Sequence, residues 1–249
     1  MSLITMSGHS HFKTIKNKKE LSDKKRGKIF SRLSKIITLA AKDKGGDPET
    51  NPSLRLAIDK AKEQNMPKDN IERAVKRGTG ELVGENLEEV TFEAYGPGGI
   101  AVIIEGITEN KNRTLSEIKM ALSQNNGKLA NEGSVKWMFE KRGCIIIDIK
   151  NQDPTTKDDI ELIAIESGAQ DAFWQNDIFI IYTKIDDLEG ARKNLLEKGI
   201  KIESASLDWV PKEEISINGK DKESCEKLFE SLDEVEAIQE IYSNIKENI

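Results

Sequence analysis

The stretch EEVTFEAYGPGGIAVIIEGIT, residues 88–108, decides the class of fold of this chain. Its first part alternates polar and apolar side chains, its second part is almost continuously apolar, and Gly96, Pro97, Gly98 and Gly99 separate the two. Alternation is typical of a strand with one face in water, and a glycine-rich break is typical of a tight connection between strands. The stretch therefore predicts a β-hairpin at the start of an α/β region.

Two α/β units are expected downstream of residue 80. In the first, Thr114 and Glu117 have the spacing of a capping box that opens a helix to Asn125, and GSVKWMFEKRG, residues 133–143, reads as a strand. The second runs over residues 144–210 in the order strand, helix, strand, strand, helix, strand. That order is the ferredoxin-like pattern.

The tail of the chain has a helix pattern over residues 221–232 and a short strand pattern in IQEIYSNI, residues 238–245. Because the first unit lacks these elements, we expect the tail to return and complete it. The predicted fold class is α+β with three domains: an N-terminal three-helix domain over residues 1–80, followed by two ferredoxin-like α/β domains. Domain two comprises residues 81–143 and 208–249, and domain three, residues 144–207, is inserted into it.

Charge divides the chain at the same point as secondary structure. The first 80 residues carry 19 Lys and Arg against 9 Asp and Glu, a net charge of +10, whereas the remaining residues carry 19 against 35, a net charge of −16; the two sum to the overall −6. We predict helices over residues 22–44, 51–65 and 67–77 of the basic part. A basic segment on an acidic body predicts a polyanionic partner for that segment.

The first predicted helix has two adjacent faces of different character. One carries Ile29, Leu33, Ile36, Ile37 and Ala40, and the other carries Lys24, Lys28, Arg32, Lys35 and Lys42. Acidic side chains are nearly absent from the basic side, so ion pairs within the helix do not account for it. Lysine acts as a point charge, which favours backbone or shape recognition. The alternative is a solvated helix face. The predicted nucleic-acid-binding residues are Gly8, His9, Ser10, Phe12, Lys13, Lys16, Lys18, Lys19, Lys24, Lys25, Lys28, Arg32 and Lys35.

Several stretches together resemble the YebC family. They include GHSHFKTIKNKK, DKKRGKIFSRL, YGPGGIAVIIEGITENKNRT and GSVKWMFEKRG, and the resemblance extends from Gly8 to LDWVPKEE and IYSNI near the C-terminus. One departure is that His11 and Phe12 stand where the family usually has Lys-Trp. The resemblance implies three domains, an N-terminal helical domain followed by two α/β domains. We expect no cofactor.

For that family the resemblance implies one of two functions. One is a cytoplasmic transcriptional regulator that binds DNA, and the other is a translation factor that engages the ribosome and assists elongation at difficult stretches such as consecutive prolines. A lysine-rich face with a basic arm favours folded RNA, since no zipper or base-reading helix is evident. A third reading is a non-catalytic adaptor that binds a basic protein through its acidic body. We expect a monomer.

A secondary contact is expected at Asn112, Arg113 and Thr114, in ENKNRT, where a helix N-terminus could engage a phosphate or a partner carboxylate. The alternative is that Thr114 caps the helix and Arg113 pairs with a neighbouring acid.

The sequence favours binding over catalysis. Residues 96–99 lack the Lys-Ser/Thr of a phosphate-binding loop, and His9 and His11 lack a third metal ligand nearby. The carboxylates of Glu93, Glu105, Glu109 and Asp148 could meet and hold magnesium, but acidic residues on strands and turns are expected to face water. We therefore predict no metal and no enzyme activity.

The remaining composition indicates a soluble protein. Apolar residues make up 37% and charged residues 33% of the 249 positions, and no run is long enough to cross a membrane. Cys144 and Cys225 lie far apart, which favours reduced thiols in the cytoplasm.

Overall fold

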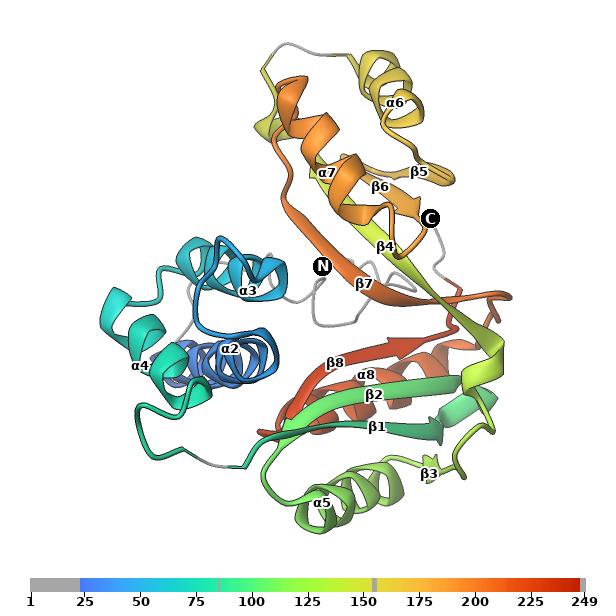
Figure 1. Cartoon of the computed structure of the whole chain (residues 1–249). Helices are drawn as coiled ribbons and strands as arrows, with labels where there is room; N and C mark the ends of the chain where they lie inside the picture. Colours follow the sequence, from blue (N-terminus) through green and yellow to red (C-terminus); the bar gives the residue numbers. More distant parts are fainter. Residues whose placement is uncertain (1–22, 85, 154–155, 247–249) are drawn as a thin grey trace.

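A helical segment comes first in the chain, and a mixed α/β region follows it. The computed structural model describes residues 23–84, 86–153 and 156–246 (Figure 1). That part contains seven α-helices and two four-stranded antiparallel sheets, with three helices before the first strand. The predicted α+β class with an N-terminal helical domain is confirmed.

The N-terminal helices are α2 (Asp23–Lys44), α3 (Pro52–Glu63) and α4 (Lys68–Gly78). Asn51 caps α3: its side-chain oxygen accepts from the Leu54 N–H at 3.0 Å, and its amide donates to carbonyl oxygens of α2 and of the turn that follows it. Gly78 lets α4 approach α2, because an added Cβ would lie 2.3 Å from the Thr38 carbonyl oxygen. A core drawn from these three helices holds the unit together.

The first sheet contains β1 (Glu88–Tyr95), β2 (Ala101–Thr108), β3 (Lys128–Leu129) and β8 (Ile238–Ser243), in the order β3-β1-β2-β8. The β1–β2 hairpin runs from Glu88 opposite Thr108 to Tyr95 opposite Ala101, with a 3-10 turn, η1 (Pro97–Gly99), at its end. Apolar residues of α5 (Lys111–Gln124) and α8 (Gly219–Asp233) share one core with the sheet. The hairpin predicted from residues 88–108 is confirmed.

The second sheet contains β4 (Phe139–Asp148), β5 (Asp171–Gln175), β6 (Ile178–Thr183) and β7 (Ser204–Pro211), in the order β5-β6-β4-β7. The helices α6 (Lys157–Glu166) and α7 (Leu188–Glu197) pack against it through a separate apolar core. In Figure 1 this unit lies above the first sheet, and the N-terminal helices lie beside both. Because β8 pairs with β2, the chain returns to its first sheet after building the second.

Two local expectations are corrected. GSVKWMFEKRG is not one strand: its middle forms the 3-10 turn η2 (Lys136–Met138), and β4 begins only at Phe139. The helix expected to open at Thr114 begins at Lys111, with Asn110 as its N-cap. The domain limits expected at residues 143 and 208 fall within β4 and β7, so as a proposal we place them after Met138 and after Pro211.

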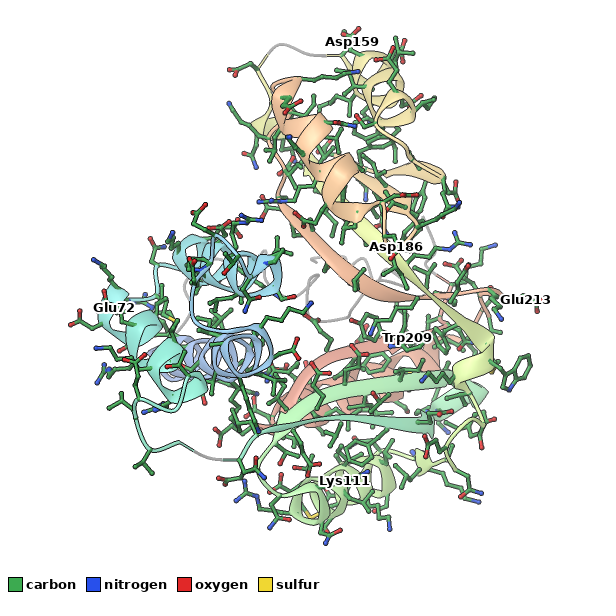
Figure 2. All side chains as sticks on the ribbon, in the orientation of Figure 1. Glu72, Lys111, Asp159, Asp186, Trp209 and Glu213 are labelled. Atoms are coloured by element: carbon green, nitrogen blue, oxygen red, sulfur yellow. The ribbon has the colours of Figure 1, made fainter. Side chains whose placement is uncertain are left out.

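A polar cluster joins the two sheets. One carboxylate oxygen of Glu105, on β2, accepts from the Trp209 indole N–H at 2.8 Å and lies 3.2 Å from the Lys141 ammonium nitrogen. Figure 2 shows Trp209 between the sheets. Phe139 and Tyr242 contribute to a small apolar cluster against which Trp209 packs.

Candidate nucleic-acid interface

The predicted binding residues fall into two groups. Gly8, His9, Ser10, Phe12, Lys13, Lys16, Lys18 and Lys19 lie outside the described residues, as does His11. Lys24 and Lys25 belong to α2, for which side chains are described from Arg26 onward. Lys28, Arg32 and Lys35 can be placed, and we call these three the basic face of α2.

The basic face lies against the end of α8. Residues 233–236, Asp-Glu-Val-Glu, begin with the last residue of α8 and lead toward β8, and we call them the acidic turn. The Arg32 guanidinium donates to a carboxylate oxygen of Asp233 at 2.9 Å and to its carbonyl oxygen at 2.6 Å. The Lys28 ammonium lies 3.3 Å from the other Asp233 carboxylate oxygen and 3.5 Å from Glu234.

The third cation completes the contact. The Lys35 ammonium lies 3.2 Å from a carboxylate oxygen of Glu236, and the Ser31 hydroxyl donates to the same oxygen at 3.0 Å. The charge and hydrogen bond of Lys35, together with the Ser31 hydrogen bond, hold the pKa of Glu236 below its ordinary value of 4.5. The basic face therefore binds oxyanions along its whole length.

These contacts differ in burial. Arg32 is 4% exposed, so its pair with Asp233 anchors the contact. The side chains of Glu234 and Glu236 remain 72% and 66% exposed, so their pairs with lysine resemble surface ion pairs, which contribute about 0–1 kcal/mol each. The helix itself lacks acids on this face, and the partners come from about 200 positions later in the chain. Spacing within the helix therefore could not predict them.

Other cations of the helical unit are exposed. They include Arg26, Lys42 and Lys44 on α2, and Lys76 and Arg77 in the last turn of α4. A polyanion can reach these side chains without displacing the acidic turn.

The predicted secondary contact does not converge on one point. Thr114 is buried and its hydroxyl donates to the Thr108 hydroxyl oxygen at 2.9 Å, so it does not cap the helix as expected. Asn110 caps α5 by accepting from the Arg113 N–H at 3.0 Å. The Arg113 guanidinium lies 3.1 Å from Glu109, one turn earlier, while Asn112 is exposed. The pairing of Arg113 with a neighbouring acid is the arrangement found.

The four carboxylates considered for a magnesium site each have their own partners. Glu93 is buried, contrary to the expectation that strand acids face water, and accepts three backbone N–H donors from residues 133–136. Glu105 joins the sheets, Glu109 pairs with Arg113, and Asp148 accepts from the Lys150 N–H. Over the described ranges, no three His, Cys, Asp or Glu side chains are grouped as a metal site.

One exposed aromatic residue was missed by the sequence reasoning. Trp137 is 66% exposed in η2, and its indole N–H donates to the Ser134 carbonyl oxygen at 2.9 Å. The Tyr95 hydroxyl donates to the same oxygen at 3.2 Å. Residues 133–143 were expected to form one strand, and in a strand the alternation of side chains would place Trp137 on a packed face. Its exposure was therefore not predicted.

Within the described ranges, no helix is both long and apolar enough to span a membrane.

Comparison with known proteins covers nearly the whole chain. Residues 10–81 match the model of the TACO1/YebC protein N-terminal domain, and residues 87–245 match that of the TACO1/YebC second and third domain. A probable transcriptional regulatory protein of Halothermothrix orenii is 48% identical over 240 residues, 96% of this chain and 94% of that protein. Another protein of that name, from Desulfatibacillum aliphaticivorans, is 46% identical over 96% of both chains.

A solved structure shares the fold. The crystal structure of a conserved hypothetical protein from Aquifex aeolicus aligns with a TM-score of 0.86 at 39% sequence identity, covering 94% of this chain and 97% of that one. Together with the family matches, this similarity shows that the chain belongs to the TACO1/YebC family.

Proposed function

We propose that the protein is a nucleic-acid-binding regulator of gene expression that engages folded RNA on the ribosome and assists elongation at difficult stretches such as consecutive prolines. The observation that carries the proposal is the basic face of α2, where three cations one turn apart hold a row of oxyanions. Phosphate oxygens are the corresponding groups on a nucleic acid, and cations on one helix face suit a row of them.

The chemistry of the face favours RNA backbone recognition. Two of its three cations are lysines, and lysine lacks the planar fork with which arginine reads guanine. Its single arginine is engaged with Asp233 through two of its nitrogens. Contacts of this kind carry charge and shape information, and folded RNA is recognised largely by shape. The exposed cations of α2 and α4 extend the same positive surface.

A second candidate function is DNA-binding transcriptional regulation. It is favoured by the relatives named probable transcriptional regulatory proteins. Binding to phosphates alone is common to both candidates, so the two differ in the nucleic acid that is preferred at equal salt.

The test compares a triple variant, Lys28→Gln, Arg32→Gln and Lys35→Gln, with the wild type. Co-sedimentation with ribosomes and retention on duplex DNA are measured over a series of salt concentrations. If all three cations contact phosphate, the slope of log affinity against log salt falls by about 2 to 3, at about 0.7–0.9 per contact. A control variant removes three exposed lysines of the second sheet's unit, Lys193, Lys198 and Lys201.

Each result has a distinct meaning. Ribosome binding that weakens in the triple variant and not in the control supports the proposal. Retention on DNA without co-sedimentation supports the second candidate instead. If the triple variant and the control have the same salt slope, the basic face does not bind nucleic acid.

A further inference from the structure

The acidic turn covers the side chains that the proposed function assigns to phosphate. We propose that the acidic turn is an intramolecular competitor, which holds the helical unit closed against the first sheet until a polyanion displaces it from the basic face of α2. This inference rests on the proposed function, since it describes the regulation of the same face.

The geometry makes the two partners mutually exclusive. The contacts between the basic face and the acidic turn are direct, at 2.6–3.5 Å, and they use all three cations. Lys28, Arg32 and Lys35 follow one another at helical spacing, and Asp233 and Glu236 meet them in order along the turn. A phosphate backbone on this face would need the same ammonium and guanidinium groups. Binding of the nucleic acid to this face, as distinct from the other exposed cations of the helical unit, therefore requires the acidic turn to leave.

The contact is also built so that it can open. The described core of the helical unit comes from α2, α3, α4 and Met66 between the last two, so separation from the sheets leaves that core intact. Two further links between the helical unit and the sheets are ion pairs: Lys60 with Glu240 at 3.6 Å, and Arg192 with Asp59 at 3.9 Å. Ion pairs near the surface are weakened by salt and replaced readily by other charges.

The connection to the first sheet permits the movement. Residues 79–84, which follow α4, are all exposed, and they include Gly80 with a φ of +81°. Glycine adopts this left-handed conformation without the steric penalty of a side chain. A change of backbone angles in this segment can swing the helical unit without breaking an element.

Weakening the acidic turn should therefore strengthen nucleic-acid binding. In the variant Asp233→Asn with Glu236→Gln, binding of a fluorescein-labelled RNA hairpin to the full chain is followed by anisotropy at low salt. We expect an affinity gain of about 5- to 30-fold, the equivalent of about 1–2 kcal/mol of lost closing contact. The gain should shrink as salt is added, because salt also opens the wild type.

A matched control separates competition from net charge. Glu213→Gln with Glu214→Gln removes the same two negative charges from exposed positions just after β7. If the acidic-turn variant binds the hairpin no more tightly than this control, the competitor is refuted while the proposed function stands. If neither the wild type nor either variant binds RNA at any salt concentration, the proposed function fails and the inference fails with it.

A distance measurement tests the opening itself. Cys144 and Cys225 are buried, so dyes can be directed to cysteines introduced at the exposed positions Ser53, on α3, and Glu223, on α8. Energy transfer between the dyes should fall when the hairpin binds, and should already be low in the acidic-turn variant. RNA binding with unchanged energy transfer in the wild type would overturn the proposal.

Discussion

Glu93 is the residue whose replacement we expect to be most informative about the first sheet. It is 5% exposed on β1, and its carboxylate accepts N–H groups of Gly133 at 2.6 Å, Val135 at 2.7 Å and Lys136 at 2.9 Å. These bonds fix the loop that carries Trp137. The replacement Glu93→Gln keeps the volume of the side chain but removes its charge and one of its two acceptor oxygens.

The magnitude follows from how the donors are shared. One carboxylate oxygen accepts from Gly133, and the other accepts from Val135 and Lys136. In its best orientation the glutamine oxygen still accepts from the Val135 and Lys136 N–H groups, in weaker bonds to a neutral acceptor. Its NH₂ group then faces the Gly133 N–H, which loses its acceptor. Hydrogen bonds to charged groups contribute about 1.5–3 kcal/mol each, and water can reach part of this loop. We expect the free energy of unfolding to fall by about 2–4 kcal/mol.

The same residue gives a pH signature. Burial alone would raise the pKa of Glu93, but the three backbone N–H groups outweigh it and hold the pKa below the ordinary value of 4.5. A lowered pKa in the folded protein stabilises the fold above the unfolded value, and this stabilisation is lost as the pH falls through the folded value. The difference in the free energy of unfolding between wild type and Glu93→Gln should therefore be largest near neutral pH and shrink below about pH 4.5.

Urea unfolding of both proteins at about pH 7 and pH 4, followed by tryptophan fluorescence, measures this difference. Glu89→Gln, an exposed acid on the same strand, is the matched control. The reasoning is refuted if the free energies of unfolding of Glu93→Gln and of that control agree within about 0.5 kcal/mol near neutral pH. It is also refuted if the difference between wild type and Glu93→Gln is the same at both pH values.

Three further outcomes follow from other parts of the molecule. Ile37 is fully buried among the N-terminal helices, so Ile37→Ala should lower the free energy of unfolding of that unit by about 2–5 kcal/mol in denaturant titrations. The same replacement of the half-buried Ile36 should lower it less. Cys144 and Cys225 should resist iodoacetamide at about pH 8 until the protein is unfolded, because both are buried. Burial also raises the pKa of Cys225 to about 12. Rapid labelling of the native chain would contradict this expectation. Glu105→Gln should loosen the junction of the two sheets by about 1–3 kcal/mol, seen as earlier proteolysis between them, and an unchanged cleavage rate would count against its role.

Sequence reasoning succeeded where structure is set by neighbours in the chain. The hairpin of residues 88–108 follows from alternation and a glycine-rich turn, and the order of elements in the second unit follows from strand and helix periods. It chose the wrong cap for α5 because Asn110 and Thr114 are both good capping residues, and only the fold shows that Thr114 points inward.

The candidate site was less accessible to the same reasoning. The cations of α2 were found because their spacing is helical, but their contact with Asp233 depends on how distant segments pack. Glu93 was expected in water because a carboxylate on a strand usually is, and its burial depends on a loop 40 residues later. Charges and periods within one element can be read from sequence, whereas the partners of a charge are set by tertiary structure.

The return of the chain to its first sheet fixes an order of events during synthesis. Until the last part of the chain leaves the ribosome, β2 has an unpaired edge and the first core lacks α8. The second sheet can form earlier, and the pairing of Phe139 with Pro211 then brings the two ends of the insertion together, which shortens the loop that β8 must close. The acidic turn is made just before β8, so the basic face of α2 leaves the ribosome well before its intramolecular partner. The helical unit is therefore made first, and the segment that pairs with its basic face follows only with α8 and β8.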